Sequence, residues 1–192
     1  MFEELLGKIA RSLEKYKLPY MVIGGQAVLL YGEPRLTRDI DITLGCDTTW
    51  LDELMRAIKG IPLESLPEDI KSFVTQTMVL PTVEKDSGIR VDFIFSFTPY
   101  EREAIKRAKA IKIGGSKVKF AAPEDIVIHK IFAGRPRDLE DIEIILKKNP
   151  EIDTGYIKSW LKKFDDSSEE PKFLSIFTSL LKSVKITAKS LP

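Results

Sequence analysis

Residues 20–44 read YMVIGGQAVLLYGEPRLTRDIDITL, and the interpretation of the whole chain starts from this stretch. It predicts an apolar strand, a turn at Gly24 and Gly25, a short helix, a charged loop and a second strand. Because side chains alternate along a strand, Asp39 and Asp41 lie on one face and the isoleucines that follow them lie on the other. One face of this strand is therefore expected to be core and the other acidic.

The acidic pair suggests a metal site. The carboxylates of Asp39 and Asp41 are about 7 Å apart along the strand, and they repel each other unless a cation lies between them. Mg²⁺ suits such hard oxygen ligands, because it binds one or two carboxylates and completes its coordination with water and substrate phosphates. Backbone amides at Gly24 and Gly25, which precede a helix, can bind such a phosphate. The residues thus predict a metal site beside an anion site.

The order Gly24-Gly25, Arg35-Leu-Thr37, Asp39-Ile-Asp41 resembles the signature of the DNA polymerase beta-like nucleotidyltransferase superfamily. The resemblance is to its minimal and toxin-type members, found in type IV toxin–antitoxin (abortive infection) systems. It implies a metal-dependent enzyme that moves a nucleoside monophosphate from an NTP, such as ATP, to a hydroxyl acceptor. In many relatives a serine follows the first glycine, whereas this chain has Gly25.

A third acid lies on a later strand, predicted over residues 89–95, where Asp92 is on the face opposite to the aromatic residues. The resemblance expects a third carboxylate on a strand next to the acidic pair, and Asp92 is the candidate. An ion pair with Arg90 or Lys112 is the alternative interpretation of this side chain. Two Mg²⁺ ions, or Mn²⁺ in their place, are the implied cofactors. The implied catalytic and metal-binding residues are Asp39, Asp41 and Asp92.

The predicted nucleotide-binding residues are Gly24, Gly25, Arg38 and Lys130. Arg38 flanks the acidic pair closely enough to neutralise charge that develops there. The resembling families place a lysine on the first helix after the core, where it contacts the triphosphate, and Lys130 matches it. The alternatives are that the stem of Lys130 covers apolar surface and that Asp138 and Asp141 hold the helices together.

Composition sets limits on the class of protein. The chain has 192 residues, of which 43% are hydrophobic, and this is ample for a packed interior. With 30 basic and 29 acidic residues the net charge is +1, so attraction of nucleic acid would depend on local patches. The single cysteine, Cys46, excludes an internal disulfide and fits a reducing compartment. No apolar run approaches the roughly 20 residues that span a bilayer, so we expect a cytoplasmic protein without membrane partners.

The predicted strands concentrate before residue 121 and the predicted helices follow it. We therefore expect an α+β fold, with a nucleotidyltransferase core over residues 1–121 and a helical C-terminal region over residues 122–192. Residues 62–67 are expected to be irregular. Pro81 is expected to place its strand, residues 78–84, near an edge of the sheet.

The sequence leaves the acceptor open. Relatives of this type modify tRNA, small molecules or hydroxyls of a partner protein. A tRNA acceptor predicts a basic groove, to which Lys117 and Lys119 can contribute, whereas a partner antitoxin predicts an exposed apolar patch. A different hypothesis is a nucleotide-binding module of the same fold that is catalytically weak or inactive. Retention of three aspartates favours the enzyme, and Gly25 favours the module.

Overall fold

The structure is a computed structural model that describes residues 2–33 and 39–189, with side chains described as far as residue 184. Its elements in chain order are α1 (Phe2–Lys15), β1 (Tyr20–Ile23), α2 (Gly24–Tyr31), β2 (Asp39–Leu44), the 3₁₀-helix η1 (Thr48–Trp50), α3 (Leu51–Ile58), β3 (Leu63–Ser65), α4 (Ile70–Thr77), β4 (Val79–Glu84), β5 (Arg90–Phe95), α5 (Pro99–Arg107), β6 (Lys109–Ile113), β7 (Ser116–Phe120), α6 (Pro123–Ala133), α7 (Pro136–Lys148), α8 (Thr154–Asp166) and α9 (Phe173–Lys189).

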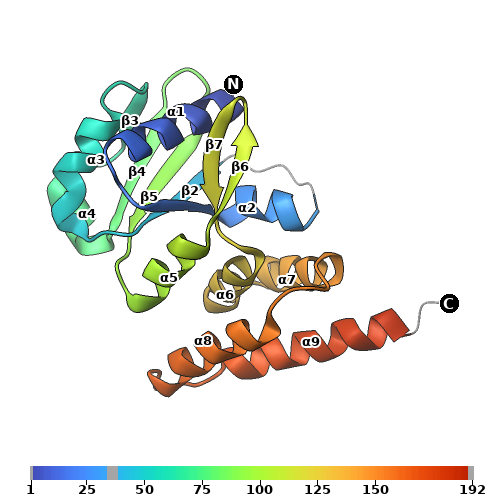
Figure 1. The fold of residues 1–192 in the computed structure, drawn as a ribbon. Coiled ribbons are helices and arrows are strands. Elements are labelled where there is room, and N and C mark those ends of the chain that lie inside the picture. The colour runs from blue at the N-terminus through green and yellow to red at the C-terminus, as the bar shows by residue number, and fades with distance from the viewer. Residues whose placement is uncertain (1, 34–38, 190–192) are drawn as a thin grey trace. The chain divides into compact units, whose positions relative to one another are not determined.

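The strands form one mixed sheet of seven, in the order β3-β4-β5-β2-β1-β7-β6 (Figure 1). The pairs β2–β5 and β1–β7 are parallel, and the other neighbours are antiparallel. Helices α6 to α9 follow the last strand, so the α+β class predicted from the sequence is confirmed. None of the helices in the described ranges is long and apolar enough to cross a membrane.

One face of the central strands is core. Ile40, Ile42 and Leu44 of β2 are fully buried, and so are Val91 and Phe93 of the neighbouring β5. Helix α1 packs against β7 and α3, and Figure 1 shows it lying across one face of the sheet. The alternation predicted from the sequence, with an apolar face and an acidic face on β2, is therefore present.

Pro81 lies near an edge of the sheet, as expected, because among the described strands only the short strand β3 lies outside its strand β4. Residues 63–65, expected to be irregular, form this outer strand. Its last bridge joins Ser65 to Thr82, and Leu66 then donates its backbone N–H to the carbonyl of Pro81. In an antiparallel strand the N–H and C=O of a residue point to the same side, so the missing N–H of Pro81 faces the position where β3 has ended. Proline therefore lacks only the N–H that would face Leu66, and the pairing of β4 with β5 on its other side continues through Pro81.

The chain divides into two compact units. Unit 1 consists of Met1–Ala27 and Leu36–Ala121, and unit 2 consists of Val28–Arg35 and Ala122–Pro192. The regions expected from the sequence differ from these units in residues 28–35, which belong with the C-terminal helices. Helix α2 therefore begins in unit 1 and ends in unit 2.

Contacts with α7 explain why the end of α2 belongs to unit 2. Lys148 donates from Nζ to the carbonyl of Gly32 at 3.0 Å, and Asn149 donates from Nδ2 to the carbonyl of Tyr31 at 2.9 Å. A Cβ atom at Gly32 would lie 3.6 Å from Cγ1 of Ile145. The last turn of α2 is thus capped by polar groups from the end of α7.

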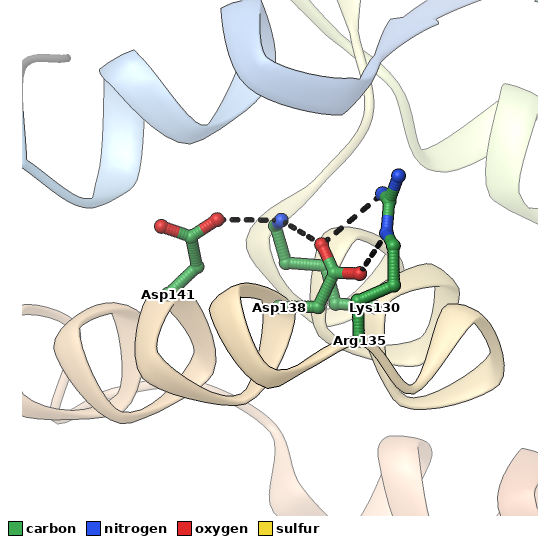
Figure 2. Close-up of polar contacts among 4 residues, drawn as sticks. All are labelled: Lys130, Arg135, Asp138 and Asp141. Carbon is green, nitrogen blue, oxygen red and sulfur yellow. Dashed lines mark hydrogen bonds and ion pairs between the residues drawn. The ribbon is translucent and has the colours of Figure 1, made fainter.

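A buried ion cluster joins α6 to α7 within unit 2 (Figure 2). Lys130 is only 6% exposed, and its Nζ donates to Asp138 Oδ1 at 2.8 Å and to Asp141 Oδ2 at 2.7 Å. Arg135, which lies in the turn between the helices, donates from Nε to Asp138 Oδ2 at 2.6 Å. Burial alone would raise the pKa of Asp138, but the hydrogen bonds from Arg135 and Lys130 outweigh it and lower that pKa. The cluster has two negative and two positive side chains, so its charge is balanced.

We predict that Lys130→Met destabilises the protein by about 3–5 kcal/mol, because it leaves two buried carboxylates without their shared cation. Urea denaturation followed by circular dichroism measures the change in the free energy of unfolding. Lys162→Met is the matched control, because Lys162 pairs with Asp166 at 2.9 Å on the surface, where both side chains are more than half exposed. The control should cost at most about 1 kcal/mol. Equal losses in the two variants would contradict the structural role of the cluster.

Candidate active site

The predicted acids meet on the face of the sheet opposite to the core. In the parallel register of β2 and β5, Asp41 is the partner of Asp92, and Asp39 is the partner of Arg90. Register partners on adjacent strands have side chains on the same face, with strand axes about 4.8 Å apart. Asp39 is exposed, whereas Asp41 and Asp92 are half-buried. The structure therefore brings Asp41 and Asp92 together. Asp39 lies on the same face of β2, two residues before Asp41.

Gly24 lies directly against the acidic face. It begins α2 with φ of +66°, a conformation that side chains other than glycine rarely adopt. A Cβ atom at Gly24 would lie 1.9 Å from Oδ2 of Asp41, so there is no room for any side chain. The antiparallel pairing of Ile23 with Asp41 produces this close approach. Helix α2 begins at Gly24, two residues earlier than the sequence predicts. Its first residue therefore borders the carboxylate of Asp41.

Arg90 forms an ion pair with one of these acids, Asp92. Its Nε donates to both carboxylate oxygens of Asp92, at 2.9 and 3.0 Å, and its side chain is 51% exposed. The hydrogen bond and charge of Asp92 raise the pKa of Arg90, and the charges of Asp39 and Asp41 act in the same direction. From the sequence, this ion pair is only the alternative interpretation of Asp92. The sequence contains a signal for this ion pair, because Arg90 and Asp92 are two residues apart and therefore lie on the same face of a strand. Asp39 and Asp41 have the same spacing on the neighbouring strand.

The donor set can be compared with the needs of a divalent cation. Asp41 and Asp92 supply adjacent carboxylates of the kind that Mg²⁺ prefers. Within the described ranges, no three His, Cys, Asp or Glu side chains are grouped so that they could hold a metal ion. Arg90 already holds the carboxylate of Asp92. The carboxylates of Asp41 and Asp92 thus have the donor chemistry that a divalent cation needs. Arg90 and such a cation would both bind the carboxylate of Asp92.

The other predicted site residues are placed as follows. Gly25 lies in the first turn of α2, next to Gly24. Arg38, like Arg35 and Thr37, lies outside the residues that the structure describes. Lys130 belongs to unit 2, where the buried ion cluster balances its charge. The roles assigned to these residues in nucleotide binding stay predictions.

Comparison with known proteins gives a family and a fold. The family model described as "Nucleotidyl transferase of unknown function (DUF2204)" matches residues 2–173. No curated protein matches the sequence.

Three solved structures with similar folds cover nearly all of the chain. The antibiotic-resistance factor ANT(2'')-Ia has a TM-score of 0.56 and 15% identity, with 98% of this chain and 97% of that chain covered. An antigenic nucleotidyltransferase-like protein from Paracoccidioides brasiliensis has a TM-score of 0.57 and 17% identity, with 94% and 91% covered. A putative nucleotidyltransferase from H. pylori has a TM-score of 0.52 and 19% identity, with 98% and 94% covered. The fold is thus that of the polymerase beta-like nucleotidyltransferases.

We predict that Gly24→Ala lowers stability by about 1–3 kcal/mol, because alanine is strained at this φ and its Cβ displaces the Asp41 carboxylate. Thermal unfolding measures the loss. Gly60→Ala is the control, because no atom lies within 4 Å of a Cβ at that position. If both variants are as stable as the wild type, the close contact between Gly24 and Asp41 is not present in solution.

Proposed function

This chain belongs to the DUF2204 family of nucleotidyl transferases, and we propose that it transfers a nucleoside monophosphate from an NTP to a hydroxyl acceptor. The observation that carries the proposal is the register of β2 and β5, in which Asp41 and Asp92 are partners while Gly24 borders Asp41. These are the residues that a phosphoryl-transfer site needs, namely paired carboxylates next to a turn that can bind phosphate.

In the proposed mechanism, Asp39, Asp41 and Asp92 would hold Mg²⁺ or Mn²⁺. When bound, such ions would lower the pKa of the acceptor hydroxyl and neutralise charge on the phosphates. The backbone amides near Gly24 bind and orient the triphosphate, so that its α-phosphorus faces the acceptor and pyrophosphate can leave. The mechanism needs no covalent intermediate on the protein.

Three further residues have proposed parts in nucleotide binding. Gly25 extends the phosphate-binding turn, and Arg38 contributes positive charge beside the acidic pair. Lys130 is proposed to contact the triphosphate, although Asp138 and Asp141 already bind its ammonium group. A loss of nucleotide affinity in Lys130→Met beyond its loss of stability would support a direct contact.

The retained acids favour an enzyme over an inactive nucleotide-binding module. A module that only binds nucleotide has no use for Asp41 and Asp92 side by side, because two carboxylates repel both each other and the phosphates. Gly25, which replaces the serine of many relatives, removes one hydroxyl and favours the module. The acids are the stronger argument, because they are needed for metal binding.

For the acceptor we propose RNA, such as a tRNA. The β6–β7 hairpin belongs to unit 1, and every charged residue from position 106 to 119 is Lys or Arg. Lys112 and Lys117 are exposed and directly opposite each other, an unfavourable pairing that a bound phosphate would relieve. Lys119, in contrast, is paired with Glu14 at 2.7 Å.

A small-molecule hydroxyl is the second candidate acceptor, because the similar structure of ANT(2'')-Ia is described as an antibiotic-resistance factor. A hydroxyl on a partner protein is the third, and it belongs to the hypothesis that this chain is the toxin of a toxin–antitoxin pair. Both alternatives predict transfer that does not depend on the lysines of the β6–β7 hairpin.

We predict that Asp41→Asn reduces nucleotide transfer at least about 100-fold without unfolding the protein, because it removes a metal-binding oxygen and its charge. The assay combines the protein, Mg²⁺, each labelled NTP in turn and total tRNA. Asp52→Asn, an exposed acid on α3 of the same unit, is the matched control and should keep full activity. Undiminished transfer by Asp41→Asn would exclude the metal mechanism. Nucleotide binding without transfer by the wild type would support the inactive module.

The RNA proposal predicts that the double variant Lys112→Glu, Lys117→Glu binds tRNA about tenfold more weakly or worse. Losing two phosphate contacts should also reduce the slope of log affinity against log salt by about 1 to 2. Filter binding over a salt series measures both quantities. The control Lys59→Glu, Lys71→Glu reverses two exposed lysines of unit 1 outside the hairpin. An equal loss in the control would mean that net charge, and not the hairpin, attracts RNA.

A further inference from the structure

We propose that Arg90 is an internal counter-ion that competes with a divalent cation for Asp92, so that the cation binds tightly only together with the nucleotide. The inference rests on the proposed function, because it concerns the order in which metal and nucleotide reach the same acids.

The acidic face of β2 and β5 carries more negative than positive charge. Asp39 and Arg90 are register partners, and so are Asp41 and Asp92, which gives a block of three acids and one base on two adjacent strands. The guanidinium of Arg90 therefore supplies a positive charge that offsets the repulsion among these carboxylates. A divalent cation at Asp92 would perform the same electrostatic task, so the two cations are alternatives.

The ion pair between Arg90 and Asp92 is accessible to solvent and therefore weak. Arg90 is 51% exposed and contacts both oxygens of Asp92, whose side chain is 18% exposed. Ion pairs that solvent reaches are weak, because water and salt compete for both partners. The pair of Lys130 with Asp138 offers a contrast, since both of those side chains are less than 10% exposed. Arg90 can therefore release Asp92, whereas the cluster around Lys130 is fixed.

The phosphates of a bound nucleotide can take the place of Asp92 as partner of the Arg90 guanidinium. A nucleoside triphosphate brings several negative oxygens to the acidic face, and guanidinium groups bind phosphate oxygens at least as well as carboxylates. When nucleotide and metal arrive together, Arg90 exchanges a carboxylate for a phosphate and Asp92 becomes available to the metal. Metal alone must displace Arg90 without any such compensation. The two ligands should consequently strengthen each other's binding.

The test measures Mn²⁺ binding by electron paramagnetic resonance on the full chain without nucleotide. Arg90→Gln should bind Mn²⁺ about three- to tenfold more tightly than the wild type, because a competing positive charge is removed. Arg90→Lys, which keeps the charge, should bind as weakly as the wild type. Arg102→Gln removes an exposed arginine of α5 in the same unit and should leave the affinity unchanged. Asp92→Asn should weaken binding in every background.

A second measurement repeats the titration with a non-hydrolysable ATP analogue. The factor by which the analogue tightens Mn²⁺ binding should be smaller in Arg90→Gln than in the wild type. Equal or weaker Mn²⁺ binding by Arg90→Gln, with Asp92→Asn still impairing the wild type, would overturn the role of Arg90 and leave the proposed function intact. Mn²⁺ binding that does not depend on Asp92 in any variant would overturn the metal site itself, and with it both proposals.

Discussion

The parallel register between β2 and β5 is the constraint on which the acidic site depends. It makes Asp41 and Asp92 direct neighbours, and a slip of one residue would turn Asp92 toward the core face. That face is filled by Ile42 and Phe93, both fully buried, which leave no place for a carboxylate. The packing of apolar side chains on one side of the sheet therefore determines the geometry of the charges on the other side.

Much of this arrangement could be predicted from the sequence, because it depends on local periodicity. Alternation along two strands predicted the acidic faces of β2 and β5. Glycines after an apolar strand predicted that the strand ends at Gly24, although α2 already begins at that residue. The α+β class followed from the concentration of strands before residue 121. Lys130 with Asp138 and Asp141 was also named as a structural alternative, since helical spacing places both acids on one face.

What could not be predicted depends on contacts between segments that are distant in the sequence. Residues 63–65 form the outermost strand β3 by pairing with β4, and nothing within residues 62–67 shows this. The end of α2 joins unit 2 because of Lys148 and Asn149, more than a hundred positions later. That Asp92 pairs with Arg90 and not with Lys112 likewise depends on the strand order, because β6, which carries Lys112, is not a neighbour of β5.

The position of β6 at the end of the strand order has one more consequence, for behaviour at high concentration. An outermost strand presents unpaired backbone N–H and C=O groups to which a strand of another chain can add. Lys109 and Lys112 are exposed on this strand, and repulsion between like-charged copies disfavours intermolecular β-pairing. Lys112, which is also proposed to attract a polyanion, thus acts together with Lys109 against aggregation, and neutral side chains at these two positions would lower solubility.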